Sequence, residues 1–309
     1  MNAKELKILF YLLLWGFVMH PCIYAQRNDS SNIFKLPIQL DSFVVKSGFD
    51  IDAFIRRVKN DTTFYKAFRS MHLVPYHAVN DIQVYDKNNI VTASLHSKTV
   101  QIINNHCRTT EVEEQRVTGD LYTYGEDYNY YTAALFAYLF FTDTPVCNDN
   151  DIVAGALAER GKGQMEKNKY QLKQLLFNPG AKVSGVPFMG DHASIFDEEE
   201  AEKYDFKVSE DTYDGVECLV FRITPKKGYE HKVLYNELTT WFRRSDYSIM
   251  ARDYSLSYST LVYDFDVRMK VRMRQVDNKL YPTHIDYDGN WHVLTKKREK
   301  VKFSVDITY

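Results

Sequence analysis

Residues 263–274 read Y-D-F-D-V-R-M-K-V-R-M-R, and this stretch decides the fold. Apolar side chains occupy every second position, at Tyr263, Phe265, Val267, Met269, Val271 and Met273. Charged side chains occupy the positions between them, at Asp264, Asp266, Arg268, Lys270, Arg272 and Arg274. Successive side chains of a strand point to opposite faces, so the stretch predicts a strand with one apolar and one charged face. This pattern is typical of an antiparallel sheet that is covered on one side only.

The sequence around this stretch, at residues 206–309, predicts strand almost throughout. Apolar and polar residues alternate over several segments, and turn residues separate them. Asp277-Asn278 predicts one turn, and Asp288-Gly289 predicts a tight hairpin turn that would bring Asp286 opposite His292. We therefore expect a meander of about six long strands.

Residues near the start of the mature chain have helical spacing. Apolar residues in the segment 51–58 follow Asp50, and a second helical run begins after Asp61 and Thr62, either of which can cap it. The pattern changes to short strands at residues 76–121. The first part of the sheet is therefore expected to follow two short helices.

The middle of the chain interrupts the strand pattern. Residues 132–141 form a compact apolar and aromatic run, which predicts a helix buried on most sides. Residues 167–177 and 197–203 also have helical patterns. We interpret residues 125–205 as a helical insertion laid on the sheet, within a single β-rich domain at 41–309.

The first 25 residues have the three parts of a secretory signal peptide: a basic start, a short apolar run, and a small residue, Ala25, before the expected cleavage site. The alternative is a retained anchor or a lipid on Cys22. Residues 26–40 are polar and predict a flexible leader. The rest of the chain has no apolar run of spanning length, so no transmembrane segment is expected in the mature protein. We predict export to the periplasm or the cell envelope.

Charge and motifs argue against several classes of function. The net charge is −2 without a separate Lys/Arg cluster, so no nucleic-acid partner is expected. The segment 155–163, G-A-L-A-E-R-G-K-G, lacks the first glycine and the Ser/Thr of a phosphate loop. His72, His77, His96 and His106 lack the spacing and companions of metal ligands. We expect no catalytic residue, metal site or cofactor, and a hydrolase is the least favoured hypothesis.

Three cysteines remain after the expected cleavage: Cys107, Cys147 and Cys218. An exported protein meets oxidising conditions, so Cys107 and Cys147 are candidates for a disulfide. The alternative, which we prefer from sequence, is that all three are reduced and buried. Cys218 lies within an alternating strand and is the strongest candidate for a free thiol.

Three strand sequences resemble a known family. They are D-G-V-E-C-L-V-F-R-I-T-P-K at 214–226, L-T-T-W-F-R-R-S-D-Y-S-I at 238–249, and Y-P-T-H-I-D-Y at 281–287. Together they resemble the outer-membrane lipoprotein-sorting proteins, the LolA-like periplasmic carriers, over roughly the last third of the chain. No arginine among Arg56, Arg57 and Arg69 aligns with the single functional arginine of that family.

The resemblance implies an α+β fold in which helices cover the concave face of a curved antiparallel β-sheet, a half-barrel. It also implies a lipid or acyl chain held between the sheet and the helices. Aromatic and methionine side chains suit such a ligand because sites for apolar ligands are mostly apolar and methionine adapts to varied shapes. The candidate ligand-binding residues are Tyr263, Phe265, Met269, Met273, Trp241 and Trp291.

A second hypothesis gives these residues no ligand. In that case the middle helices fill the space above the sheet, and the core is dry. The protein would then be a structural or interaction module of the cell envelope. Its charged face or an edge strand would bind an envelope protein partner. The occupancy of the space between helices and sheet distinguishes the two hypotheses.

Overall fold

The computed structural model describes residues 36, 38–40, 49–125, 127–142, 144–147, 176–180, 192–261, 263–293 and 297–309. The expected signal peptide, most of the expected leader, the segment 155–163 and most of the expected helix at 167–177 lie outside these residues. Residues Leu36–Tyr309 form one compact unit. No helix among the described residues is both long and apolar enough to cross a membrane.

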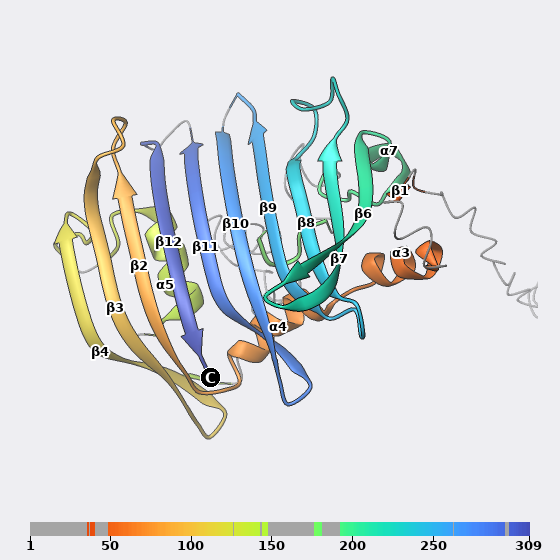
Figure 1. Cartoon of the computed structure of the whole chain (residues 1–309). Coiled ribbons are helices and arrows are strands. Elements are labelled where there is room, and N and C mark those ends of the chain that lie inside the picture. Colours follow the sequence, from red (N-terminus) through yellow and green to blue (C-terminus); the bar gives the residue numbers. More distant parts are fainter. Residues whose placement is uncertain are drawn as a thin grey trace, which may run out of the picture. The chain divides into compact units, whose positions relative to one another are not determined.

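Twelve strands of the described chain form one open sheet (Figure 1). They are β1 (Ile38–Leu40), β2 (Tyr76–Tyr85), β3 (Val91–Asn104), β4 (Cys107–Gly119), β5 (Val146–Cys147), β6 (Tyr204–Tyr213), β7 (Val216–Pro225), β8 (Tyr235–Arg243), β9 (Ile249–Ser259), β10 (Tyr263–Val276), β11 (Lys279–Val293) and β12 (Glu299–Thr308). Their order is β1-β6-β7-β8-β9-β10-β11-β12-β2-β3-β4-β5. The short β1, which falls in the expected leader, pairs parallel with β6, and the other pairs are antiparallel.

The alternation expected of residues 263–274 is confirmed in β10. Phe265, Val267 and Met269 are buried, whereas Asp266, Arg268 and Lys270 lie on the opposite, solvent-exposed side. Directly opposed residues of neighbouring strands share a face, so the division into a buried and an exposed side continues from β10 into the neighbouring strands. A slip of one residue would bury the charges, which fixes the register.

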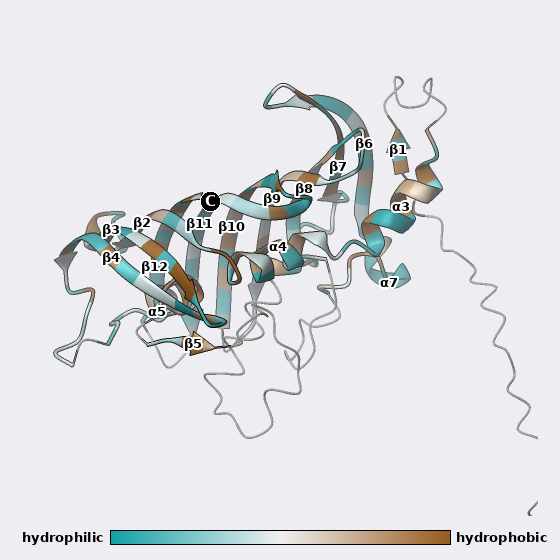
Figure 2. Ribbon diagram, turned by 90° about the horizontal axis from the view of Figure 1, so that it is seen from below, coloured by the Kyte–Doolittle hydropathy of each residue, from teal (hydrophilic) through white to brown (hydrophobic). Residues whose placement is uncertain are grey.

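Four helices accompany the sheet in the described chain: α3 (Ile51–Lys59), α4 (Thr63–Met71), α5 (Tyr131–Phe140) and α7 (Glu198–Ala201). The sheet is curved, and α4 and α5 lie on its concave side (Figure 2). We call this side the inner face and the charged side the outer face. The expected α+β fold, a curved sheet with helices over one face, is thus confirmed. Helices are also confirmed in four of the expected segments: 51–58, the run after Asp61 and Thr62, 132–141 and 197–203.

Carboxylates cap the starts of two helices, and one of them also joins its helix to the sheet. The Asp50 side chain caps α3 by accepting from the backbone N–H of Ala53 at 2.9 Å. At the start of α5, the Glu299 carboxylate of β12 accepts from the backbone N–H groups of Tyr131 at 2.7 Å and Thr132 at 2.9 Å. These donors have no partner within the helix, and the negative charge suits the helix N-terminus. Glu299 therefore positions α5 on the inner face.

The hairpin expected at Asp288-Gly289 is not present, and this prediction is wrong. Both residues lie within β11, and the chain turns at Asp277 and Asn278, whose φ angles are 47° and 61°. Gly289 is required for another reason: a Cβ there would lie 2.1 Å from the Oη of Tyr287, whose ring covers this position. A glycine inside a strand often marks such a close approach.

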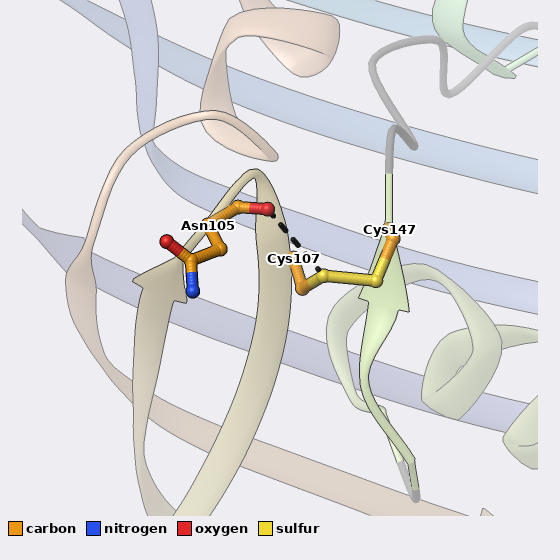
Figure 3. Close-up of a disulfide and its surroundings, with 3 residues drawn as sticks. All are labelled: Asn105, Cys107 and Cys147. Carbon is orange, nitrogen blue, oxygen red and sulfur yellow. Dashed lines mark hydrogen bonds between the residues drawn. A yellow bond between two sulfur atoms is a disulfide. The ribbon is translucent and has the colours of Figure 1, made fainter.

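The preferred interpretation of the cysteines is also wrong. Cys107 of β4 and Cys147 of β5 are directly opposed and form a disulfide that closes a 40-residue separation (Figure 3). The pairing depends on a two-residue strand, β5, that no alternation in the sequence indicates. The expectation for Cys218 is confirmed, because it is a buried free thiol.

Charged residues pair across the strands of the outer face. His284 of β11 lies between two carboxylates, 3.0 Å from Asp286 and 2.6 Å from Asp306. His292 pairs with Asp264 at 3.3 Å, so the expected pairing of His292 with Asp286 is not formed. Burial alone lowers the pKa of His284, but the hydrogen bonds to the two carboxylates outweigh burial and raise this pKa above its ordinary value.

The raised pKa of His284 predicts a pH dependence of stability. A group that binds its proton more tightly in the folded state stabilises that state fully below its unfolded pKa, about 6.5 for histidine. This contribution is then lost as the pH rises through the folded pKa of His284. We expect the difference in unfolding free energy between the wild type and His284→Gln to be largest at acidic pH and to shrink above neutrality. A His284 NMR resonance that titrates below the ordinary histidine value would contradict this.

Candidate functional site

The inner face carries three aromatic side chains in a row across β9, β10 and β11. Phe265 of β10 is directly opposed by Tyr258 of β9 on one side and by Trp291 of β11 on the other. The rings of Phe265 and Trp291 are stacked, with centroids 4.6 Å apart. Phe265 is buried, and its neighbours Tyr258 and Trp291 are half-buried. We call these three residues the aromatic row.

The residues next to the aromatic row are closely packed. Trp291 donates its indole N–H to the Tyr287 hydroxyl, and the Tyr287 ring stacks on Phe303 of β12 at 4.5 Å. Phe303 in turn packs against Phe136 of α5 at 4.4 Å. Burial raises the pKa of Tyr287, so its hydroxyl stays neutral at ordinary pH. This packing continues the row into the core beneath α5.

The two candidate methionines belong to this packed core. Met269 is buried, and its Sδ lies 3.2 Å from the hydroxyl of Tyr254, which also contacts the carbonyl oxygen of Leu176. Met273 is buried opposite Pro282, just after a bulge at Thr283 of β11. Described side chains therefore fill the inner face around Met269, as the dry-core hypothesis expects.

Trp241 lies on the other side of the sheet. It is directly opposed by Ala251, which is itself opposed by Arg272 of the outer face. Its ring packs against Tyr213 at 5.8 Å, and the Arg272 guanidinium lies 5.8 Å from the Tyr213 ring. The bulge that follows lies in β9, where Met250 is the extra residue. Leu238, Thr240 and Phe242 alternate regularly on the inner face of β8, so Trp241 lies between inner-face residues and points outward.

The remaining candidate is Tyr263, whose backbone begins β10 opposite Val293. Its side chain is outside the described part of the structure. Of the six sequence candidates, the structure thus joins Phe265 and Trp291 directly and buries Met269 and Met273 on the same face. It separates Trp241 from them.

A polar cluster lies beside the row and was missed by sequence reasoning. Glu200 of α7 is buried, and its Oε1 accepts hydrogen bonds from Lys203 Nζ and from His192 Nδ1, the latter at 2.9 Å. The His192 ring lies 6.0 Å from that of Tyr258. Burial, and then the charge of Glu200, raise the pKa of Tyr258. The alternation of β9 could have indicated Tyr258, but no sequence signal joins the acidic start of α7 to that strand.

A buried charge also lies on the inner face, next to α4. Arg252 of β9 donates from Nε to Thr240 Oγ1 at 3.0 Å, and its guanidinium lies 4.3 Å from the ring of Phe64. Burial lowers the pKa of Arg252, and the charge of Asp61 opposes that shift. Buried charges need such partners, so Arg252 joins β9 to the α4 region.

Two hollows lie away from the aromatic row. One of about 130 Å³ lies beside β4 and is lined by Leu95, Val112, Gln115, Tyr122, Tyr128 and Phe141, among others. The other, of about 440 Å³, lies on the outer face between charged residues that include Asp81, Arg268, Lys270, Asp288 and Lys302. Within the described residues, no group of three His, Cys, Asp or Glu side chains could hold a metal ion.

No family model matches the sequence, and no curated protein matches it either. Solved structures do match. One is a putative outer membrane lipoprotein-sorting protein domain from Vibrio parahaemolyticus, at 11% identity and a TM-score of 0.27, covering 78% of this chain and 87% of that one. Another is a LolA superfamily protein from Nitrosomonas europaea, at 10% identity and a TM-score of 0.23, covering 80% and 90%.

A third structure is a DUF1329 family protein from Desulfovibrio piger, at 13% identity and a TM-score of 0.24, covering 85% of this chain and 91% of that one. The resemblance indicated by the sequence is thus also found by structure, and it spans more than the last third of the chain.

Proposed function

We propose that this chain is an exported, non-enzymatic envelope protein that binds an apolar, lipid-like ligand at the aromatic row. The observation that supports this is the stacked pair of Phe265 and Trp291, flanked by Tyr258, on the helix-covered face. Aromatic rings offer large, rigid apolar surfaces, and ligand sites are mostly apolar with a few polar groups at their margin.

The packing restricts where such a ligand can lie. Described side chains already fill the face around Met269 and Tyr287, so an acyl chain would contact the row itself rather than run the length of β10. The cluster of His192, Glu200 and Lys203 at the Tyr258 end supplies polar groups for a head group. The ligand is therefore expected to be amphiphilic.

Export is supported by the chain's own chemistry. Disulfides persist in oxidising compartments, and Cys107 with Cys147 forms one. The first 25 residues have the pattern of a secretory signal peptide. Mass spectrometry of the amino terminus of the exported protein would test the expected cleavage after Ala25.

Ligand binding predicts different effects for two tryptophans. Trp291→Ala removes half of the stacked pair, so we expect it to weaken the binding of a fluorescent fatty acid by about tenfold. Trp241→Ala is the matched control, because that tryptophan packs on the outer face. Titrations of the delipidated protein measure both. A clean apo mass spectrum together with no uptake by the wild type would refute the proposal.

A second candidate function is an interaction module of the envelope. The observation in its favour is the outer-face hollow, where Lys270 makes no ion pair with any described residue. A partner carboxylate there would gain a charge-assisted hydrogen bond. Envelope extracts should then yield a partner that binds the wild type and not Lys270→Glu. Equal recovery by both proteins would count against this function.

A further inference from the structure

The β4 edge of the sheet is largely unpaired in the described chain. β5 pairs only with Cys107 and Arg108, and beyond Arg108 the strand partner of β4 is β3 alone among the described residues. From Glu111 to Thr118 the side chains are exposed. The backbone N–H and C=O groups along such an edge are a template for another strand.

This edge carries apolar side chains on the inner face. Val112 is 54% exposed and Val117 is 37% exposed, and they oppose Thr99 and Leu95 of β3. They share a face although they are five residues apart, because a bulge makes Glu113 an extra residue. Charged residues at inward positions would protect an edge from pairing, and β4 has valines there instead.

We propose that β4 pairs antiparallel with the β4 of a second copy of this chain, about a two-fold axis through Gln115. In this register Glu114 of each copy opposes Arg116 of the other. With Glu113 bulged in both strands, Val112 of each copy opposes Val117 of the other. The interface is isologous, so each of these pairs forms twice.

The faces of the sheet agree with this register. Val112 and Val117 lie on the inner face in both copies, and Glu114 and Arg116 lie on the outer face opposite Lys98 and His96 of β3. Opposed residues across a strand pair must share a face, and each proposed pair does.

The sequence of β4 favours its own copy over a different partner. Opposite charges lie one residue to either side of Gln115, and after the bulge is counted the two valines are also equidistant from it. Opposite charges and apolar residues are favourable cross-strand pairs, whereas like charges are unfavourable. Antiparallel pairing of two β4 strands places an opposite charge beside each of Glu114 and Arg116 and a valine beside each valine. A strand of different sequence would have to match them independently.

Charge exchange tests the register. We expect the disulfide-intact full chain to dimerise in sedimentation equilibrium. Glu114→Arg or Arg116→Glu alone places like charges opposite each other twice, so each should raise the dissociation constant by about tenfold or more. An equimolar mixture of the two single variants restores opposite charges at both pairs. It should form a heterodimer as tightly as the wild type forms its homodimer.

A second pair of variants tests the valines. Val117→Lys should also weaken the dimer. Val79→Lys is the matched control, because Val79 is equally exposed at 37% but lies on β2, which has strands on both sides. Circular dichroism establishes that each variant is folded. A wild type that stays monomeric at its solubility limit, or single charge variants that dimerise as the wild type does, would overturn the proposal.

Discussion

Replacing both Cys107 and Cys147 by serine is expected to lower the free energy of unfolding by about 4 kcal/mol. The disulfide closes a separation of 40 residues, and in the chain-entropy account a cross-link stabilises the native state by restricting the unfolded chain. Neither cysteine is fully buried, so serine fits without leaving a cavity. Urea denaturation measures the change, and the m-value should rise because the unfolded variant is less compact.

Reduction provides the control for this prediction. The wild type in excess dithiothreitol should match the double serine variant, and the variant itself should not respond to the reductant. Cys218→Ala keeps the disulfide and removes the buried free thiol, so its stability should still depend on reductant. An oxidised wild type that unfolds within about 1 kcal/mol of the double serine variant would contradict the entropic account.

The sequence predicted the features of the fold that are encoded locally. The alternation in β10 identified its two faces, because each residue's side is set by its neighbours along the strand. The helix after Asp50 was found for the same reason, since capping and helical spacing act within one turn or two.

The sequence did not reveal features that depend on contacts between distant segments. Asp288-Gly289 has the residues of a hairpin turn, but Gly289 is needed because the Tyr287 ring lies over it within a long strand. Trp241 was assigned to the wrong face for a different reason, because the alternation of Leu238, Thr240 and Phe242 along β8 already places it on the outer face. Tyr258 and the polar cluster were missed because Tyr258 and Glu200 come together only when α7 packs near β9.

Gly289→Ala is expected to destabilise the protein by about 3 kcal/mol. The new methyl group would lie 2.1 Å from Oη and 2.3 Å from Cζ of Tyr287, so the ring must leave its position. Overpacking a core costs about 1–3 kcal/mol, and the displaced ring also loses its stacking on Phe303. The hydrogen bond from Trp291 to Tyr287 is lost at the same time, which a change in tryptophan fluorescence would report.

A double-mutant cycle separates this mechanism from a general intolerance of β11. Tyr287→Ala alone should cost about 3–5 kcal/mol, because it removes a large buried ring. In that background the methyl group at position 289 meets no ring, and alanine is preferred to glycine in a strand by about 0.5–1 kcal/mol. Gly289→Ala should therefore change from destabilising to slightly stabilising when Tyr287 is absent. A substitution that is equally harmful in both backgrounds would show that the backbone of β11, and not the Tyr287 ring, requires the glycine.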